Sequence, residues 1–172
     1  MSLDRFIEQI KSRGMSRTNK FRVTISPPKA LRDAFRVEDI QIYCTQAALP
    51  GISLTLTENE MSGAAKKVAV SEGNDDIDLV FYVGADMKEK NFFDRWMKMI
   101  VDPNTHRASY YDDYVGQIII ETLANDGKTK TYAVKLVEAH PMAITPVQLD
   151  GTEQDAVMKL QVTITWRKAY PV

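Results

Sequence analysis

The stretch Asp86–Val101 constrains the fold of this chain most, because it is the one long amphipathic helix that the sequence predicts. At about 100° per residue, its apolar and charged side chains fall on opposite arcs of the helix. The apolar arc holds Phe92, Phe93, Trp96, Met97, Met99 and Ile100. The charged arc holds Lys90, Asp94, Arg95 and Lys98. Three aromatic rings make this the heaviest apolar face available, so we expect it to enter the core by covering a sheet.

The sequence also predicts where this helix begins and ends. Asp86 is a candidate N-cap because Glu89 follows three residues later, an arrangement close to a capping box. Asp102-Pro103 is expected to end the helix, since a proline disfavours helical geometry in the residue before it. The predicted element therefore has a defined length, and the segments on either side indicate what it covers.

Much of the remaining chain alternates apolar and polar residues, which is the pattern of half-buried β-strands. The predicted strands are 21–26, 37–45, 52–57, a segment around Val68 and Val70, 77–83, 116–123, 129–139 and 158–167. Asn125-Asp126-Gly127 is a strong hairpin signal. The prolines of 140–146 exclude that segment from a central strand. Residues 29–36 are predicted to form a loop with one helical turn.

Two parts of the chain are predicted to reach beyond the body. Residues 52–70 form a long hairpin with a polar tip at Glu58–Ala64. At the N-terminus, apolar residues spaced i, i+3, i+4 and i+7 predict a short amphipathic helix that ends near Gly14. These apolar residues are Leu3, Phe6, Ile7 and Ile10. A helix this short is marginal in isolation, so its stripe must dock on its own sheet or on another subunit.

These elements predict a mainly β protein of the α+β class. The expected architecture is an antiparallel β-sandwich or flattened barrel, with one long flanking helix and a short N-terminal helix. A chain of 172 residues is expected to form a single domain. Within it, residues 1–18 form the N-terminal helix and arm, and residues 19–172 form the sandwich that carries helix 86–101.

Composition restricts the possible classes of protein. No apolar run reaches the roughly 20 residues that span a bilayer, and the first residues lack a signal-peptide core. We therefore expect the protein to be made and kept in a cytoplasm. Cys44 is the only cysteine, which rules out an internal disulfide and a multi-cysteine metal site.

Few residues could support catalysis or metal binding. His106 and His140 lie in or next to proline-containing loops, and we assign them structural rather than catalytic roles. Asp75, Asp76 and Asp78 lack the glycine and the distal glutamate of an EF-hand loop. We therefore predict no catalytic residue, no metal ligand and no cofactor.

Charge is distributed unevenly along the chain. Residues 1–36 hold nine Lys and Arg against three Asp and Glu, a net charge of +6, whereas the remainder holds 13 basic and 20 acidic residues, a net charge of −7. A basic arm for nucleic acid, a basic end that meets the acidic body of a neighbouring copy, and solvated loops of mixed sign are all consistent with this pattern. The basic part lacks the interleaved aromatic residues that stack on bases, so sequence-specific nucleic-acid binding is not expected.

Several motifs, taken in order along the chain, resemble those of one protein family. They are Asn19-Lys20-Phe21-Arg22-Val23 after the short helix, Cys44-x-x-Ala47-x-Leu49-Pro50-Gly51, Phe92-Phe93-Asp94-Arg95-Trp96 followed by Asp102-Pro103, the stretch from Tyr132 to Met142, and Pro146-Val147-x-Leu149-Asp150. Their combination resembles the tail tube proteins of contractile-tailed bacteriophages and related phage-tail-like particles. The resemblance covers nearly the whole chain, and the segment Pro27–Glu38 departs from it.

The resemblance implies a structural, non-enzymatic subunit whose hexameric rings stack into a hollow tube inside a contractile sheath. The implied partners are further copies of the chain and the sheath, tape-measure, baseplate and tail-terminator proteins. DNA passes through such a tube without sequence-specific binding, and there is no membrane anchor. The implied location is the virion tail, after assembly in the host bacterial cytoplasm. Two alternatives are the tube of a bacterial contractile secretion system or a tailocin, and a monomeric β-sandwich that binds nucleic acid or carbohydrate.

Under this interpretation, the N-terminal helix and the hairpin reach adjacent subunits, and the charged arc of helix 86–101 faces a neighbouring subunit or the sheath. The expected contact residues are Leu3, Phe6, Ile7, Ile10, Glu58, Asn59, Glu60, Met61, Lys66 and Lys67. The family resemblance also implies an acidic lumen, which limits adhesion of DNA phosphates. The candidate lumen-facing acids are Glu58, Glu60, Asp75, Asp76 and Asp78, with ordinary solvated loop positions as the alternative.

Overall fold

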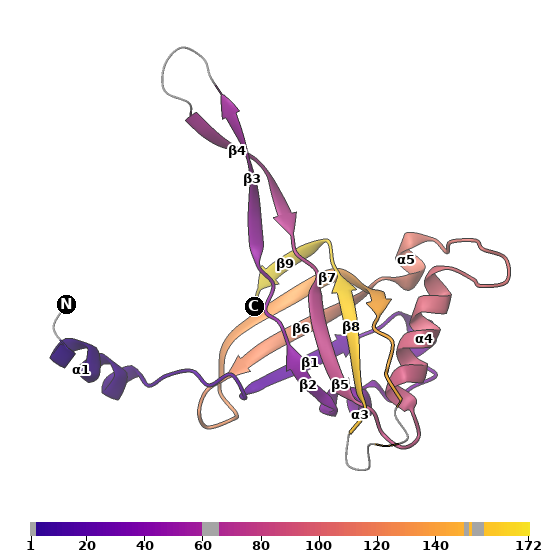
Figure 1. The fold of residues 1–172 in the computed structure, drawn as a ribbon, viewed down its shortest axis with the longest axis horizontal. Coiled ribbons are helices and arrows are strands. Elements are labelled where there is room, and N and C mark those ends of the chain that lie inside the picture. The colour runs from indigo at the N-terminus through magenta and orange to yellow at the C-terminus, as the bar shows by residue number, and fades with distance from the viewer. Residues whose placement is uncertain (1–2, 60–65, 150–151, 153–156) are drawn as a thin grey trace.

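The computed structural model describes residues 3–59, 66–149, 152 and 157–172 of the chain (Figure 1). The helices are α1 (Leu3–Arg13), α2 (Lys29–Arg32), α3 (Val37–Ile42), α4 (Lys88–Ile100) and α5 (Tyr111–Tyr114). The strands are β1 (Phe21–Ser26), β2 (Cys44–Ala47), β3 (Ile52–Asn59), β4 (Lys66–Asn74), β5 (Ile77–Tyr82), β6 (Gly116–Leu123), β7 (Lys130–Ile144), β8 (Lys159–Thr165) and β9 (Lys168–Pro171).

The strands of the body form one curved antiparallel sheet in the order β1-β6-β7-β8-β5-β2, and β9 also pairs with β7. The long strand β7 belongs to both halves of this sheet. It pairs with β6 and β9 up to Ala139, and from His140 onward it pairs with β8. Between the two halves, Glu138 is an extra residue at φ 57 that forms a bulge, and bulges bend strands in this way. The predicted class, a mainly antiparallel β protein with one long flanking helix, is confirmed.

The core lies between the sheet and α4, which flanks one end of the body (Figure 1). Phe92, Phe93 and Trp96 are fully buried, whereas Met97 and Ile100 are half-buried. The rings pack on the sheet, with the centroids of Phe93 and Phe81 5.1 Å apart. The indole Nε1 of Trp96 donates a hydrogen bond to the carbonyl of Tyr114 at 2.8 Å, which ties α4 to the chain entering β6.

Gly116 begins β6 directly beside this indole. A Cβ at Gly116 would lie 2.7 Å from the carbonyl oxygen of Ser26 and 3.0 Å from Cζ2 of Trp96. Only glycine allows this approach, so the first residue of β6 and the side chain of Trp96 are fitted to each other.

The predicted N-cap of α4 is wrong. Met87 occupies the N-cap position in a left-handed conformation, with φ 53, and makes no side-chain capping hydrogen bond. Asp86 instead forms an ion pair with Lys88. The carboxylate of Glu89 is buried and accepts a hydrogen bond from the backbone N–H of Gly84 at 3.0 Å. The glutamate of the expected capping box therefore binds the backbone of the loop before the helix and does not cap the helix.

The predicted strand 37–45 is also wrong over most of its length. Residues Val37–Ile42 form α3, and only Cys44–Ala47 pair as a strand. Val37 and Ile40 are three residues apart, and both are buried on one face of the helix, while Ile42 is 80% exposed. In so short a segment, an alternating pattern fits a helical turn as well as a strand.

The predicted strand 129–139 is longer than expected, because residues 140–144 continue β7. Their proline excludes them from a central strand, and they have a partner strand on one side only among the described strands. β7 continues through Pro141, which lies opposite Ile164 of β8, with an irregularity before Ala143. Beyond Ala139 this part of β7 pairs with β8 alone among the described strands. A proline is tolerated in a stretch of strand that has a partner on one side only.

Trp96→Ala is expected to lower the free energy of unfolding by about 3–5 kcal/mol, because it empties a fully buried site in the core. Lys98→Ala, on the exposed face of the same helix, should change it by less than about 0.5 kcal/mol. Chemical denaturation followed by far-UV circular dichroism, which does not rely on tryptophan fluorescence, measures both. Equal stability of the Trp96→Ala variant and the unaltered protein would contradict the assignment of α4 to the core.

Candidate assembly surfaces

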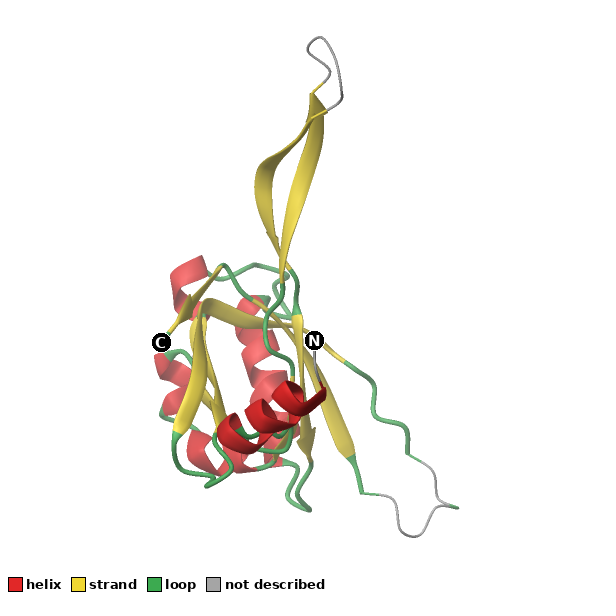
Figure 2. Cartoon of the chain, turned by 90° about the vertical axis from the view of Figure 1, so that its left-hand side faces the viewer, coloured by secondary structure: helices red, strands yellow, loops and turns green. Residues whose placement is uncertain are grey.

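Strands β3 and β4 form a separate two-stranded arm that projects from the body (Figures 1 and 2). This confirms the predicted hairpin. Ile52, Leu54 and Leu56 alternate along β3 and share one face of the arm, and they are 67%, 59% and 53% exposed. An isolated two-stranded hairpin is marginally stable, and a stripe of exposed apolar side chains marks an interaction surface. We call these three residues the arm stripe.

The other contacts within the arm are polar and weak. Ser53 Oγ donates to the carbonyl of Gly73 at 3.2 Å. Lys67 and Glu58 form an ion pair at 3.5 Å in which both side chains are more than half exposed, and such pairs add little stability. Of the other predicted contact residues, Asn59 pairs in register with Lys66 at the end of the described ladder. Glu60 and Met61 lie outside the described residues.

Helix α1 stands apart from the body at the end of a linker (Figure 1). Leu3 is 71% exposed and Ile7 is 41% exposed, while Ile10 is half-buried. The helix ends at Gly14, which has φ +70 and whose N–H donates to the carbonyl of Ile10 at 2.9 Å. This is the usual glycine stop of a helix. The predicted contact residue Phe6 lies within α1. The apolar stripe of α1 is thus largely open to solvent.

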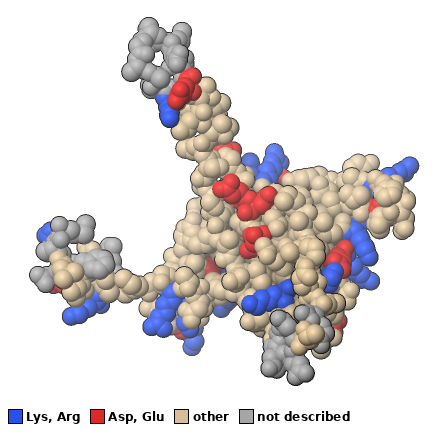
Figure 3. Space-filling view, viewed as in Figure 1, with Lys and Arg blue, Asp and Glu red and all other residues tan. Residues whose placement is uncertain are grey.

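The predicted lumen acids separate into two places. Asp75, Asp76 and Asp78 lie together where β4 passes into β5, and all three are exposed. The acidic side chains near the base of the arm are visible in Figure 3. The carboxylate of Asp78 accepts hydrogen bonds from Thr163 at 2.7 Å and from Gln161 at 3.0 Å, both on β8. Glu58 lies farther out along the arm, so the structure does not bring it to this cluster.

No group of metal-ligating side chains occurs within the described part of the chain. His140 packs its ring against Tyr114 and Tyr111, with centroids 5.2 and 6.3 Å away. Desolvation by this packing lowers the pKa of His140 below its ordinary value, so the ring is neutral at pH 7. His106 lies in a tight turn with φ 53. Cys44 is half-buried, and burial raises its pKa to about 12, so its thiol is unreactive at neutral pH.

Besides Glu89, a second buried carboxylate was not predicted. Glu121 of β6 is 5% exposed although it lies on the face of the sheet away from the core. It pairs with Arg22 at 3.8 Å and with Lys130. Arg22 lies directly opposite it in the β1–β6 register. The sequence signal was the strand alignment, which could not be read before the pairing of β1 with β6 was known.

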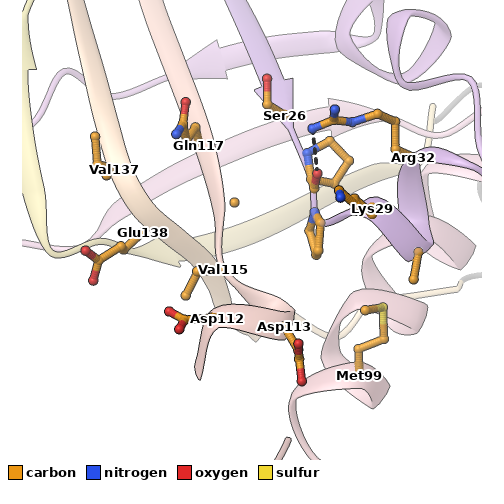
Figure 4. A pocket seen from close by; sticks show the side chains of 14 residues that line it. Ser26, Lys29, Arg32, Met99, Asp112, Asp113, Val115, Gln117, Val137 and Glu138 are labelled. Carbon is orange, nitrogen blue, oxygen red and sulfur yellow. Dashed lines mark hydrogen bonds between the residues drawn. The ribbon is translucent and has the colours of Figure 1, made fainter. Parts of the chain in front are cut away.

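A groove at the C-terminal end of β1 was also missed. Its wall of apolar side chains includes Pro27, Pro28, Met99 and Val115. Its charged side chains are Lys29, Arg32, Asp112, Asp113 and Glu138. In Figure 4, Lys29 and Arg32 lie on the α2 side and the two aspartates lie on the α5 side. We call this the β1-end groove.

Comparison with known proteins identifies the family. A family described as phage tail tube protein matches residues 16–170. A chain of the cryo-EM structure of an extracellular contractile injection system, the PVC sheath-tube complex in the extended state, has a TM-score of 0.69 at 16% identity, covering 100% of this chain and 98% of that chain. A chain of the anti-feeding prophage tube-terminating cap has a TM-score of 0.68 at 18% identity, covering 92% and 91%.

The likeness extends more weakly to other structures. Hcp1 from Flavobacterium johnsoniae has a TM-score of 0.51 at 10% identity, covering 88% of this chain and 93% of that chain. At these identities the structural matches establish a shared fold. No curated protein matches the chain by sequence. Among the described helices, none has the length and apolar character needed to cross a membrane.

Proposed function

We propose that this chain, which belongs to the phage tail tube protein family, assembles into hexameric rings that stack as a hollow tube inside a contractile sheath. The arm stripe is the observation that carries the proposal. Ile52, Leu54 and Leu56 present apolar surface that the isolated chain leaves in water. A stacked ring gives this surface a neighbouring copy to bury it, at about 25 cal/mol per Å² of apolar area.

The free edges of the sheet support ring formation. β1 and β2 end the strand path of the body and each pairs with one strand only, among the described strands. Open edges of this kind template pairing with other chains. In a ring whose subunits meet edge to edge, these open strand edges are paired. The subunit would then act as wall material, with no catalytic step.

The tube would conduct DNA after being filled by a tape-measure protein during assembly. Asp75, Asp76 and Asp78 are the candidates for an acidic lining, together with Glu58 of the arm and with Glu60, which lies outside the described residues. Acidic walls repel phosphates and so keep DNA from adhering. We place such a tube in a virion tail that is assembled in the host bacterial cytoplasm, with sheath, baseplate and tail-terminator proteins as partners.

A second candidate is the tube of a phage-like particle or a secretion system rather than of a phage. The likeness to an extracellular contractile injection system and to the anti-feeding prophage cap favours this alternative. Both candidates use the same subunit contacts, so the same variants test the assembly. Whether purified particles package DNA separates them.

Leu54→Asp is expected to abolish tubes while leaving the monomer folded. Leu54 is exposed in the single chain, so the stability of the monomer should change by less than about 0.5 kcal/mol. A carboxylate in a buried contact should reduce polymerisation at least tenfold, which corresponds to about 1.4 kcal/mol per contact. Negative-stain electron microscopy and sedimentation measure the tubes.

Thr55→Asp is the matched control, because Thr55 alternates with Leu54 along β3, lies on the opposite face of the arm and pairs with Ser71. It should retain tubes. If the unaltered protein forms only monodisperse particles at high concentration, the assembly proposal fails and the chain is a monomeric binding module instead.

Deletion of residues 1–12 is expected to leave a folded monomer that does not polymerise. The helix that is removed has exposed apolar side chains, so its loss should not disturb the core. Size-exclusion chromatography and far-UV circular dichroism follow the two properties separately. Normal tubes from the truncated chain would show that α1 takes no part in assembly.

A further inference from the structure

Helix α1 and the β1-end groove lie at opposite ends of the same strand. The linker from α1 enters β1 at Phe21, and the groove begins at Ser26. β1 is six residues long, so Phe21 and Ser26 are five rises, or about 17 Å, apart at the usual rise per residue. A contact between two different surfaces of identical subunits is heterologous, and it generates rings or helical filaments.

The two surfaces are complementary in polarity. The stripe of α1 offers Leu3 and Ile7, both exposed, and the groove offers the half-buried side chains of Met99 and Val115 beside the buried ring of Pro27. An α-helix of this size needs such a wall, since eleven residues form a marginal helix in isolation.

The charges are complementary as well. Asp112 and Asp113 are exposed on the α5 side of the groove, and no described lysine or arginine forms an ion pair with either. Arg5 and Lys11 of α1 are exposed basic side chains. On the α2 side, Lys29 can meet Glu8 of α1, while Arg32 already donates to the carbonyl of Pro27 at 3.2 Å.

We infer that α1 of one subunit docks in the β1-end groove of the next copy of this chain. This inference rests on the proposed assembly and names the site that receives α1. It also gives a role to the segment that follows β1, because Pro27 to Arg32 form one wall of the groove. That segment is part of the region where the sequence departs from the family pattern.

Docking of α1 in the groove of its own chain is opposed by the linker. The carbonyl of Met15 accepts a hydrogen bond from Asn125 Nδ2 at 3.5 Å, in the turn between β6 and β7. The backbone N–H of Leu123 donates to the carbonyl of Lys20 at 2.9 Å. The linker is thus attached beside the Phe21 end of β1, and only Gly14 separates Met15 from the end of α1.

Disulfide trapping in assembled tubes tests the contact. The variant carries Ile7→Cys in α1 and Ala30→Cys in the groove, with Cys44→Ala to remove the native thiol. After mild oxidation we expect a ladder of covalent oligomers on a non-reducing gel. The control replaces Ala30→Cys by Glu38→Cys, which lies on α3 outside the groove, and should give a several-fold weaker ladder.

The outcomes separate the two proposals. Tubes that form normally but give no ladder, equal ladders in both variants, or only an intrachain disulfide would overturn the docking of α1 in the groove and leave the tube assembly standing. Absence of tubes from the unaltered protein would overturn the assembly itself.

Charge reversal gives an independent measure that needs no cysteine. Asp112→Lys with Asp113→Lys should reduce sedimentable tubes at least tenfold, and Arg5→Glu with Lys11→Glu in the same chain should restore a large part of them. Glu38→Lys with Asp39→Lys is the matched control, since both acid pairs lie in the first turn of a short helix. Tubes that are unaffected by the Asp112 and Asp113 reversal, or a loss as large in the control, would contradict the proposed contact.

Discussion

The packing of the aromatic face of α4 against the sheet is the interaction on which the rest of the structure depends. Phe92, Phe93 and Trp96 have no exposed surface, and together they fill the space that the curved sheet encloses. Trp96 also fixes the path of the chain, because its indole is bonded to Tyr114 and touches the position of Gly116. β6 begins at this contact and pairs with β1 on one side and with β7 on the other.

This self-sufficient body contrasts with the parts that extend from it. The arm stripe and the exposed residues Leu3 and Ile7 of α1 lie outside the core, and their apolar side chains remain largely in water. Each is short enough to be marginal in isolation. The conformational entropy lost when these two elements become ordered is therefore offset only when a second copy supplies contacts. Their ordering is coupled to assembly.

The sequence predicted the strands and turns that depend on alternating hydrophobicity and on turn-forming residues. β6 was placed at its observed bounds, and Asn125-Asp126-Gly127 does join β6 to β7. α3 was missed because Ile40, Ile42 and Cys44 alternate as in a strand, whereas Val37 and Ile40 give only one i, i+3 pair to indicate a helix. β9 was missed because it is four residues long and depends on its pairing with β7. The continuation of β7 through Pro141 depends on which side of the strand has a partner, which only the topology decides.

The candidate assembly surfaces also divide into those that the sequence predicts and those that only the fold reveals. The arm and α1 could be predicted, since each is a continuous segment with its own pattern. The β1-end groove could not, because its walls come from residues 26–32, Met99 and residues 112–117, which only the fold brings together.

The distribution of charge shows the same limit. The excess of basic residues in 1–36 suggested one basic end, but the fold places these residues on different parts of the molecule. Arg5 and Lys11 lie on the projecting helix, Arg22 neutralises Glu121 within the sheet, and Lys29 and Arg32 line the groove. The net charge of a segment therefore says little about assembly. The position of the charges says more: basic side chains of α1 and the unpaired acids of the groove lie one strand length apart on the same chain.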